Sequence, residues 1–288
     1  MKIRIGGVPE HFNYPWHYGI RKGYFQNKGI EIVWNDFPGG TGAMCEALKN
    51  NELDMAILLT EGAVKAIIQG ANFKISKTFV DTPLIWGIHT SATNKKASLS
   101  NLASMNYAIS RFGSGSHLMA HVHADESQIE LIETQMKMVG NIDNARESLK
   151  NGDSDLIFWE KFMTKPFVDS GELIRLGCFP TPWPCFMIVT NNTFDNQNSD
   201  KICSLFEVLN TIILELNSSD FKRTEIASLY KLRQDDTDEW LKSTEWNCNF
   251  DLKGTSILNV CHTLKKLRLT DTIPPVNQLI QKSINLVI

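Results

Sequence analysis

Through the first ninety residues, short apolar runs alternate with longer segments of helical spacing, and this alternation restricts the fold more than any other feature. Parallel strands need a crossover connection, which is usually a helix. The runs predict strands at 3–8, 30–34, 54–59 and 73–80, with helices that begin near Pro15, Thr41 and Glu61. This part of the chain therefore predicts a mostly parallel sheet with helices on its faces.

A second series of the same kind follows a further strand at 84–89 and a polar stretch at 90–100. Its pattern predicts strands at 107–110, 129–134, 156–159 and 173–177, and helices at 116–125, 144–151 and 161–169. Three prolines within 180–184 stiffen an extended connection, because proline fits neither a helix interior nor a central strand. An apolar strand at 186–190 and a helical C-terminal part complete the chain.

Two chain crossings, near residues 90 and 185, make the second series an insertion in the first. We therefore expect two α/β lobes, one formed by residues 1–89 and 186–288 and the other by residues 90–185. The two strands that join them would act as hinges. Ligands of open α/β sheets bind beyond the carboxyl ends of the strands, so a ligand cleft is expected between the lobes.

The composition excludes several classes of partner. The net charge is -3 and the basic residues are dispersed, so nucleic acid is not expected as a partner. No apolar run approaches the ~18 residues of a membrane-spanning helix. The six cysteines include no C-x-x-C pair, which favours reduced thiols. The first residues enter a strand pattern without a secretion signal, so we expect a cytoplasmic location, or an extracytoplasmic one if a signal peptide was removed.

Two glycine-rich turns, at 38–42 and 112–117, lead from a strand into a helix. Free N–H groups and the helix dipole favour negative charge at such a position, although many turns of this kind only cap a helix. Neither turn has the spacing of a Walker loop or of a dinucleotide-binding motif, so no cofactor is expected. The candidate ligand contacts in these turns are Gly40, Thr41, Ser114, Gly115, Ser116 and His117.

Aromatic and acidic residues at strand ends are further candidates. Trp and Tyr suit stacking on a ring-bearing ligand, although core packing is the ordinary role of any one of them. Glu61 and Glu160 follow strands, where each would accept ligand N–H donors or would complement a helix dipole. His117 and His121 are four residues apart, but no third ligand lies nearby in sequence, so no metal is expected. The aromatic candidates are Phe12, Trp16, Trp86 and Trp159, beside Tyr14 and Trp183.

Several of these segments together resemble the NMT1/THI5-like, or SsuA-like, family of substrate-binding proteins. The resemblance is carried by Arg21-Lys22-Gly23-Tyr24-Phe25, Phe37-Pro38-Gly39-Gly40-Thr41-Gly42, Arg111-Phe112-Gly113-Ser114-Gly115-Ser116-His117 and Trp159-Glu160-Lys161-Phe162. It implies the type II periplasmic-binding-protein fold, with contacts from the loop at 9–16, Gly40-Thr41, Thr60-Glu61, 114–117 and Trp159-Glu160. The family includes binders of alkanesulfonates, taurine and thiamine pyrimidine precursors. A related cytoplasmic group, which includes fungal proteins, is similar in lacking an export signal.

One branch of the family makes the thiamine pyrimidine from pyridoxal phosphate and a histidine. Its lysine and histidine would fall around Leu58 and Gly62, and neither residue can form a Schiff base or supply an imidazole. Three hypotheses therefore remain. The first is a protein that closes two lobes around a heterocyclic, sulfonate or carboxylate metabolite. The second is an enzyme that uses Glu61, Glu160 or His117 as acid or base. The third is a transport receptor, although an ABC transporter partner is not expected without an export signal.

Overall fold

The computed structural model describes residues 1–282 and 284–287, and the chain divides into two compact units. Unit 1 comprises residues 1–82 and 183–288, and unit 2 comprises residues 83–182. The first crossing therefore lies at 82 and not at 89, because the strand β5 (Ile85–Ser91) pairs with two strands of unit 2. The second crossing lies at 182 and not at 185, since Cys185 donates its N–H to the carbonyl of Thr82.

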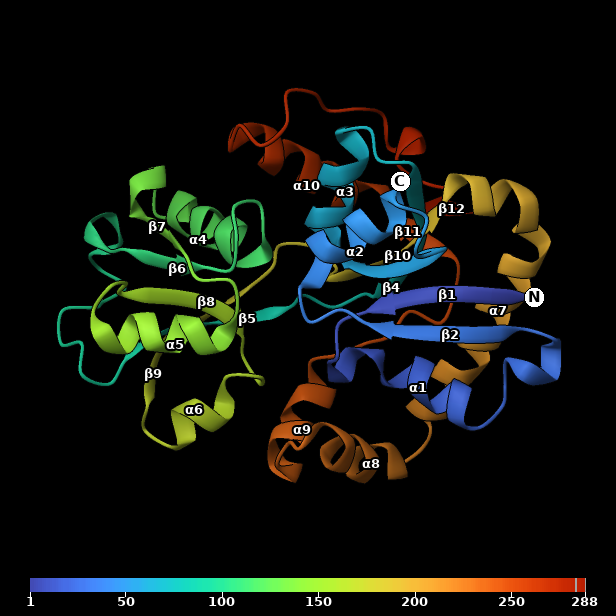
Figure 1. Ribbon diagram of the computed structural model, residues 1–288, viewed down its shortest axis with the longest axis horizontal. Helices are drawn as coiled ribbons and strands as arrows, with labels where there is room; N and C mark the ends of the chain where they lie inside the picture. The colour runs from blue at the N-terminus through green and yellow to red at the C-terminus, as the bar shows by residue number, and fades with distance from the viewer. Residues whose placement is uncertain (283, 288) are drawn as a thin grey trace. The chain divides into compact units, whose positions relative to one another are not determined.

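Unit 1 contains a five-stranded sheet with the order β2-β1-β3-β10-β4 (Figure 1). The strand β1 is parallel to both β2 and β3, whereas β10 runs antiparallel to β3 and β4. A mostly parallel sheet is thus confirmed, with one reversed strand near its middle. The strands are β1 (Lys2–Gly7), β2 (Glu31–Asp36), β3 (Met55–Leu59), β4 (Phe73–Val80) and β10 (Phe186–Asn191).

Helices cover both faces of this sheet, with α2, α3 and α10 on one side and α1, α8 and α9 on the other (Figure 1). A small parallel pair of strands, β11 with β12, was not expected from the helical pattern of the C-terminal part. The helices of unit 1 are α1 (Tyr14–Arg21), α2 (Gly40–Lys49), α3 (Thr60–Ile68), α7 (Asn192–Asn217), α8 (Phe221–Tyr230), α9 (Gln234–Lys242) and α10 (Gly254–Lys266). Its short 3-10 helices are η1 (His11–Asn13), η2 (Gln26–Lys28) and η5 (Val276–Gln278), and its small strands are β11 (Asp251–Lys253) and β12 (Asn285–Val287).

The core of unit 1 lies on both faces of the sheet, so its central strands are apolar over most of their length. Residues 55–58 of β3 and residues 186–189 of β10 are all buried. Burying this much apolar surface is the main stabilising contribution to such a sheet. One charge is also buried, since Lys77 on β4 donates to Asn247 Oδ1 at 2.6 Å and to the carbonyl of Asn249. Burial lowers the pKa of Lys77 to about 8.

Unit 2 has its own five-stranded sheet with the order β7-β6-β8-β5-β9. The strands β6, β7 and β8 are parallel, whereas β5 runs antiparallel to β8 and β9. The strands are β5 (Ile85–Ser91), β6 (Tyr107–Ile109), β7 (Met136–Met138), β8 (Leu156–Glu160) and β9 (Leu173–Pro180). The helices are α4 (Gly115–Glu126), α5 (Ile142–Asn151) and α6 (Lys165–Asp169), with 3-10 turns η3 (Leu102–Ser104) and η4 (Glu133–Gln135).

Two expectations for unit 2 were wrong in detail. The apolar run at 129–134 is not a strand, because the side chain of Gln135 fixes this segment in another conformation. Its Oε1 accepts from Ile132 N–H, and its Nε2 donates to the carbonyls of Ala103 and Met105. The strand follows at β7 instead. The helix expected from residue 161 begins only at Lys165, with Pro166 in its first turn, where its missing N–H costs no hydrogen bond.

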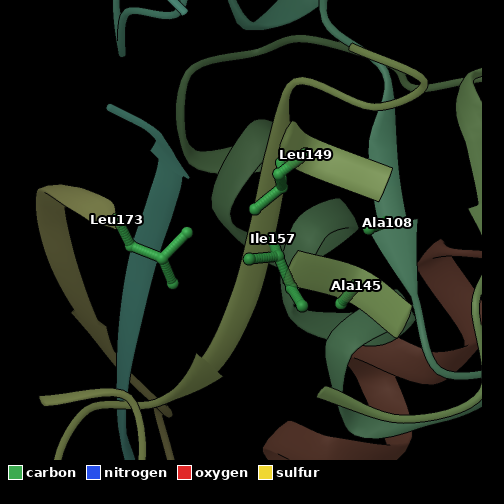
Figure 2. Close-up of a cluster of buried hydrophobic side chains, with 5 residues drawn as sticks. All are labelled: Ala108, Ala145, Leu149, Ile157 and Leu173. Carbon is green, nitrogen blue, oxygen red and sulfur yellow. The ribbon is translucent and has the colours of Figure 1, made fainter. Parts of the chain in front are cut away.

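One face of the unit 2 sheet packs on α5 through a cluster of buried side chains. Figure 2 shows the cluster, which joins Leu149 and Ala145 of α5 to Ile157 of β8, Ala108 and Leu173. Trp159 is partly buried against this cluster. Since side chains alternate along a strand, Ile157 and Trp159 share the α5 face of the sheet.

Candidate functional site

The carboxyl ends of the unit 1 strands meet the start of β10, where two helices begin. Leu59 N–H donates to Thr41 Oγ1 at 3.1 Å, which ties the first turn of α2 to the end of β3. Thr60 begins α3, and its N–H donates to the carbonyl of Cys185 at 3.0 Å, while its hydroxyl donates to the carbonyl of Pro184. The expected group of Thr41, Thr60 and Glu61 is therefore brought together at one edge of the unit 1 sheet.

Glu61 is the residue at this edge whose bonding is incomplete. It is 3% exposed, and its Oε2 accepts a hydrogen bond from Trp183 Nε1 at 2.9 Å. Its Oε1 is buried and has no hydrogen-bond partner among the described residues. Burial raises the pKa of Glu61 to about 7, against the lowering effects of its own backbone N–H and of the hydrogen bond from Trp183. Near neutral pH this carboxyl group can hold or release a proton.

Gly40 has a left-handed backbone with φ of 66°, and the space where a Cβ would lie is open to at least 4 Å. The chain at this turn therefore leaves room for a neighbouring group. Gly40 N–H, however, donates to the carbonyl of Phe37 at 2.9 Å, so this amide closes a turn.

Phe12 and Trp16 are packed inside unit 1. Trp16 is 0% exposed and contacts the rings of Phe25, Trp34 and Phe79. Phe12 is 3% exposed and contacts Phe186 and Trp240. Both aromatic residues therefore pack in the core, which was the alternative to stacking on a ligand. Their contact with a ligand stays a prediction.

His11, beside Phe12, was not singled out in the sequence. It is 0% exposed, it contacts the rings of Tyr230 and Trp240, and neither of its ring nitrogens has a partner among the described residues. Burial lowers the pKa of His11 to about 3, so the ring is neutral. A histidine inside a run of aromatic residues is the one sequence signal that could have drawn attention to it.

In unit 2, Trp86 is the second residue of β5, which is antiparallel to β8, and Trp86 pairs with Glu160 at the carboxyl end of β8. Its indole is 6% exposed, and Nε1 has no acceptor in residues 1–282 and 284–287. This edge of unit 2 therefore offers a buried N–H donor, just as the edge of unit 1 offers a buried acceptor.

The turn before α4 is bonded largely within itself. Ser114 is the N-cap residue, and its Oγ accepts from His117 N–H at 3.4 Å and contacts Ser116 Oγ at 3.1 Å. Ser116 Oγ accepts from Ser110 N–H at 3.0 Å, and His117 Nδ1 accepts from Gly113 N–H at 3.1 Å. The helix cap that was the alternative role for this turn is thus present, and Gly115 opens the helix. Ligand contact by these residues stays a prediction.

Glu160 and Trp159 are adjacent in sequence but face different sides of the unit 2 sheet. Trp159 lies on the α5 side with the cluster of Figure 2. Glu160 is 4% exposed, and its Oε2 accepts from the N–H groups of Phe162 at 2.8 Å and Met163 at 2.6 Å. The carboxylate therefore organises the turn that leads to α6.

Within the described residues there is no cluster of three or more His, Cys, Asp and Glu side chains that could hold a metal ion. The rings of His117 and His121 lie 4.8 Å apart, without a third such side chain. None of the helices in this part of the chain is both long and apolar enough to cross a membrane.

The two α/β units with mixed sheets define the class: the chain has the periplasmic-binding-protein fold. Residues 86–179 match the model of the family described as Ca3427-like PBP. The chain is similar over its full length to the Candida albicans CA3427 gene product, with 27% identity, a TM-score of 0.92 and coverage of 98% of that chain. That structure is described as defining a new family of proteins with the generic periplasmic binding protein fold.

Two more distant structures share the fold. The alkanesulfonate-binding protein SsuA from Xanthomonas axonopodis pv. citri, bound to MOPS, is 14% identical with a TM-score of 0.81 over 97% of this chain and 98% of that one. PhnD1 from Prochlorococcus marinus, in complex with methylphosphonate, is 12% identical with a TM-score of 0.63 over 93% and 98%. No curated protein matches the chain in sequence.

Proposed function

We propose that the chain is a binding protein for a small ring-bearing or anionic metabolite. The observation that carries this proposal is the buried Glu61 carboxyl group, whose Oε1 has no donor in the described part of the chain. A buried polar atom without a partner costs about 1–3 kcal/mol. A ligand N–H group that bonds to Oε1 would remove this cost, so the empty acceptor favours binding.

The Nε1–H group of Trp86 supports the same proposal from unit 2, because it lacks an acceptor within the residues described. A group that pairs with Glu61 Oε1 is an N–H donor, and a group that pairs with Trp86 Nε1–H is an acceptor. An aminopyrimidine has both on one flat ring, which fits the resemblance to binders of thiamine pyrimidine precursors. The sulfonate group of MOPS and the phosphonate group of methylphosphonate, the ligands of the SsuA and PhnD1 structures, supply acceptors, and neither group itself carries an N–H.

A thermal-shift and titration series tests the proposal, because a ligand that binds the folded state raises the unfolding temperature. The probes are the hydroxymethyl-aminopyrimidine precursor of thiamine, MOPS and methylphosphonate. We expect the aminopyrimidine to stabilise the protein most. Glu61→Gln, which places an N–H donor among the groups facing the ligand, weakens its binding at least about tenfold. Glu31→Gln, an exposed acid of the same unit, is the control and leaves affinity unchanged.

Two results would contradict this proposal: no probe changes the unfolding temperature, or Glu61→Gln binds the aminopyrimidine as tightly as the unaltered chain.

An enzyme is the second candidate, and it rests on the pKa of about 7 that burial gives Glu61. An acid that titrates near the working pH is suited to general acid–base catalysis. Mass spectrometry of a bound probe after long incubation separates the two functions. A probe recovered unchanged supports the binding protein, whereas a converted probe whose conversion stops in Glu61→Gln supports the enzyme.

A further inference from the structure

A cavity lies in unit 1, at the end of α3 that is far from Glu61. It has a volume of about 330 Å3 and is lined by Ile68, Gln69, Arg268, Leu269, Thr270, Asp271 and Thr272. The helix α3 begins at Thr60 and ends at Ile68, and nine residues span about 13 Å at 1.5 Å per residue. The cavity is therefore a separate site from the edge that carries Glu61.

The carboxyl ends of two helices meet at this cavity. The helices α3 and α10 pack side by side (Figure 1), and the cavity lining begins with the last residue of α3 and the second residue after α10. A helix C-terminus carries a partial negative charge from its unpaired carbonyl groups. Two such ends disfavour an anion that enters the cavity without a cationic group of its own.

The side chains of the lining carry charges of both signs that are not used elsewhere. Arg268 and Asp271 form no side-chain hydrogen bond or ion pair with any described residue. Arg268 would repel a simple cation, and Asp271 together with the helix ends would repel a simple anion. A molecule with separate positive and negative groups satisfies both requirements.

A buried hydroxyl group gives the cavity a third polar contact. Thr270 is 7% exposed, and its Oγ1 is buried without a hydrogen-bond partner in residues 1–282 and 284–287. Because Thr270 lines the cavity, a ligand in the cavity can supply the missing partner. The volume is at the lower end of the range of small-molecule sites, which suits a small metabolite.

We propose that this cavity binds a zwitterionic α-amino acid, with its carboxylate on Arg268, its ammonium group on Asp271 and a further hydrogen bond to Thr270. The guanidinium group of arginine matches a carboxylate in geometry, and the bond between them is charge-assisted. The ammonium group lies toward the helix carbonyl ends, where positive charge is stabilised. This site is independent of the function proposed above.

Saturation-transfer NMR on the whole chain tests this site, with an equimolar mixture of glycine, L-serine, L-glutamine and L-leucine as the probe. We expect transfer to at least one amino acid, and a loss of affinity of about tenfold or more in Arg268→Met and in Asp271→Asn. Thr270→Val, which removes only the hydroxyl group, weakens binding to a smaller extent. N-acetylated and C-amidated forms of the bound amino acid, each lacking one charge, give no transfer.

The control variant is Lys231→Met. Lys231 is another exposed cation in unit 1 that follows a helix with a left-handed backbone, with φ of 56° against 57° for Arg268. Transfer that persists in Lys231→Met and in Glu61→Gln, and is lost in Arg268→Met, supports the proposed site. Absence of transfer to every amino acid overturns it. Transfer that survives Arg268→Met also overturns the proposed site. If that transfer is lost in Glu61→Gln, the amino acid binds at the edge that carries Glu61.

Discussion

The two units each have an acid at the end of a sheet, and the two acids have opposite bonding. Glu160 of unit 2 accepts from the N–H groups of Phe162 and Met163. Glu61 of unit 1 is equally buried, yet it has one donor, Trp183, and one oxygen without a partner among the described residues. The same sequence pattern, an acid after an apolar strand, therefore produces a structural cap in one unit and an open acceptor in the other.

The difference comes from the backbone immediately after each acid. Glu61 lies inside the first turn of α3, whose helix begins at Thr60 without a gap after β3. Glu160 ends β8, and four residues separate it from α6, so the carboxylate can bond to the amides of the intervening turn. Glu61 is bonded instead by the indole of Trp183, from a distant part of the sequence.

The largest expected effect is the pH dependence that Glu61 gives to stability. Its pKa rises from 4.5 to about 7 on folding, so the folded state keeps a proton that the unfolded state loses as the pH rises through this window. Stability therefore falls between about pH 4.5 and 7, by about 3 kcal/mol from this group, and is constant above that range. Glu61→Gln, which cannot titrate, removes this contribution.

Denaturation by urea at pH 5, 6, 7 and 8, followed by tryptophan fluorescence, measures the effect. Glu10 and His11 also have shifted pKa values in overlapping ranges, so the measured quantity is the difference in unfolding free energy between Glu61→Gln and the unaltered chain. We expect this difference to grow in favour of the variant as the pH rises. A difference that does not change with pH would show that Glu61 is ionised in the folded state.

The cap in unit 2 gives the next largest effect. Glu160→Ala removes the acceptor of two backbone N–H groups at a site that is 4% exposed, and we expect a loss of about 2 kcal/mol. Glu160→Gln keeps one acceptor oxygen and loses less. Hydrogen exchange measured at the amides of Phe162 and Met163 locates the loss in this turn.

The control for this cap is Glu126→Ala, an exposed acid at the end of α4, which we expect to leave exchange unchanged. If Glu160→Ala left the protection of both amides intact, the carboxylate would have another role, and the contrast between the two units would fail.

The fold could be predicted largely from the sequence because strands and helices have distinct apolar periods. The five strands expected in the first ninety residues are present, with ends shifted by at most two residues. The predictions that failed depend on distant or polar contacts. Residues 251–253 form a strand only because residues 285–287 pair with them, and the run at 129–134 is held by a glutamine side chain.

The site was only partly predictable, for the same reason. Trp183 donates to Glu61 across 122 positions of sequence, and no local pattern indicates this pair. Burial of Trp16 and Phe12 depends on which rings surround them in the folded unit. Local spacing identifies residues near strand ends. It does not show which of their polar atoms remain without a hydrogen-bond partner once the side chains are packed.

The smallest expected effect concerns Gly62, which follows Glu61 in α3. A Cβ at this position would lie 2.5 Å from Thr41 Cγ2, closer than two carbon atoms can approach. Replacing a helical glycine by alanine normally stabilises by about 1 kcal/mol. Here we expect Gly62→Ala to destabilise by about 1 kcal/mol instead, because overpacking outweighs the gain in helix propensity.

The double variant Thr41→Ser/Gly62→Ala tests this reason directly. Serine lacks Cγ2 but keeps the hydroxyl group that accepts from Leu59 N–H, and the next nearest atom of residue 41 is then 3.4 Å from the new Cβ. We expect Gly62→Ala to become stabilising in the Thr41→Ser background, which urea denaturation of the four chains measures as a coupling energy. If Gly62→Ala changed the unfolding free energy equally in both backgrounds, the contact with Thr41 Cγ2 would not be the cause. In that case α2 and α3 would move apart without cost, and the edge around Glu61 would not be rigid.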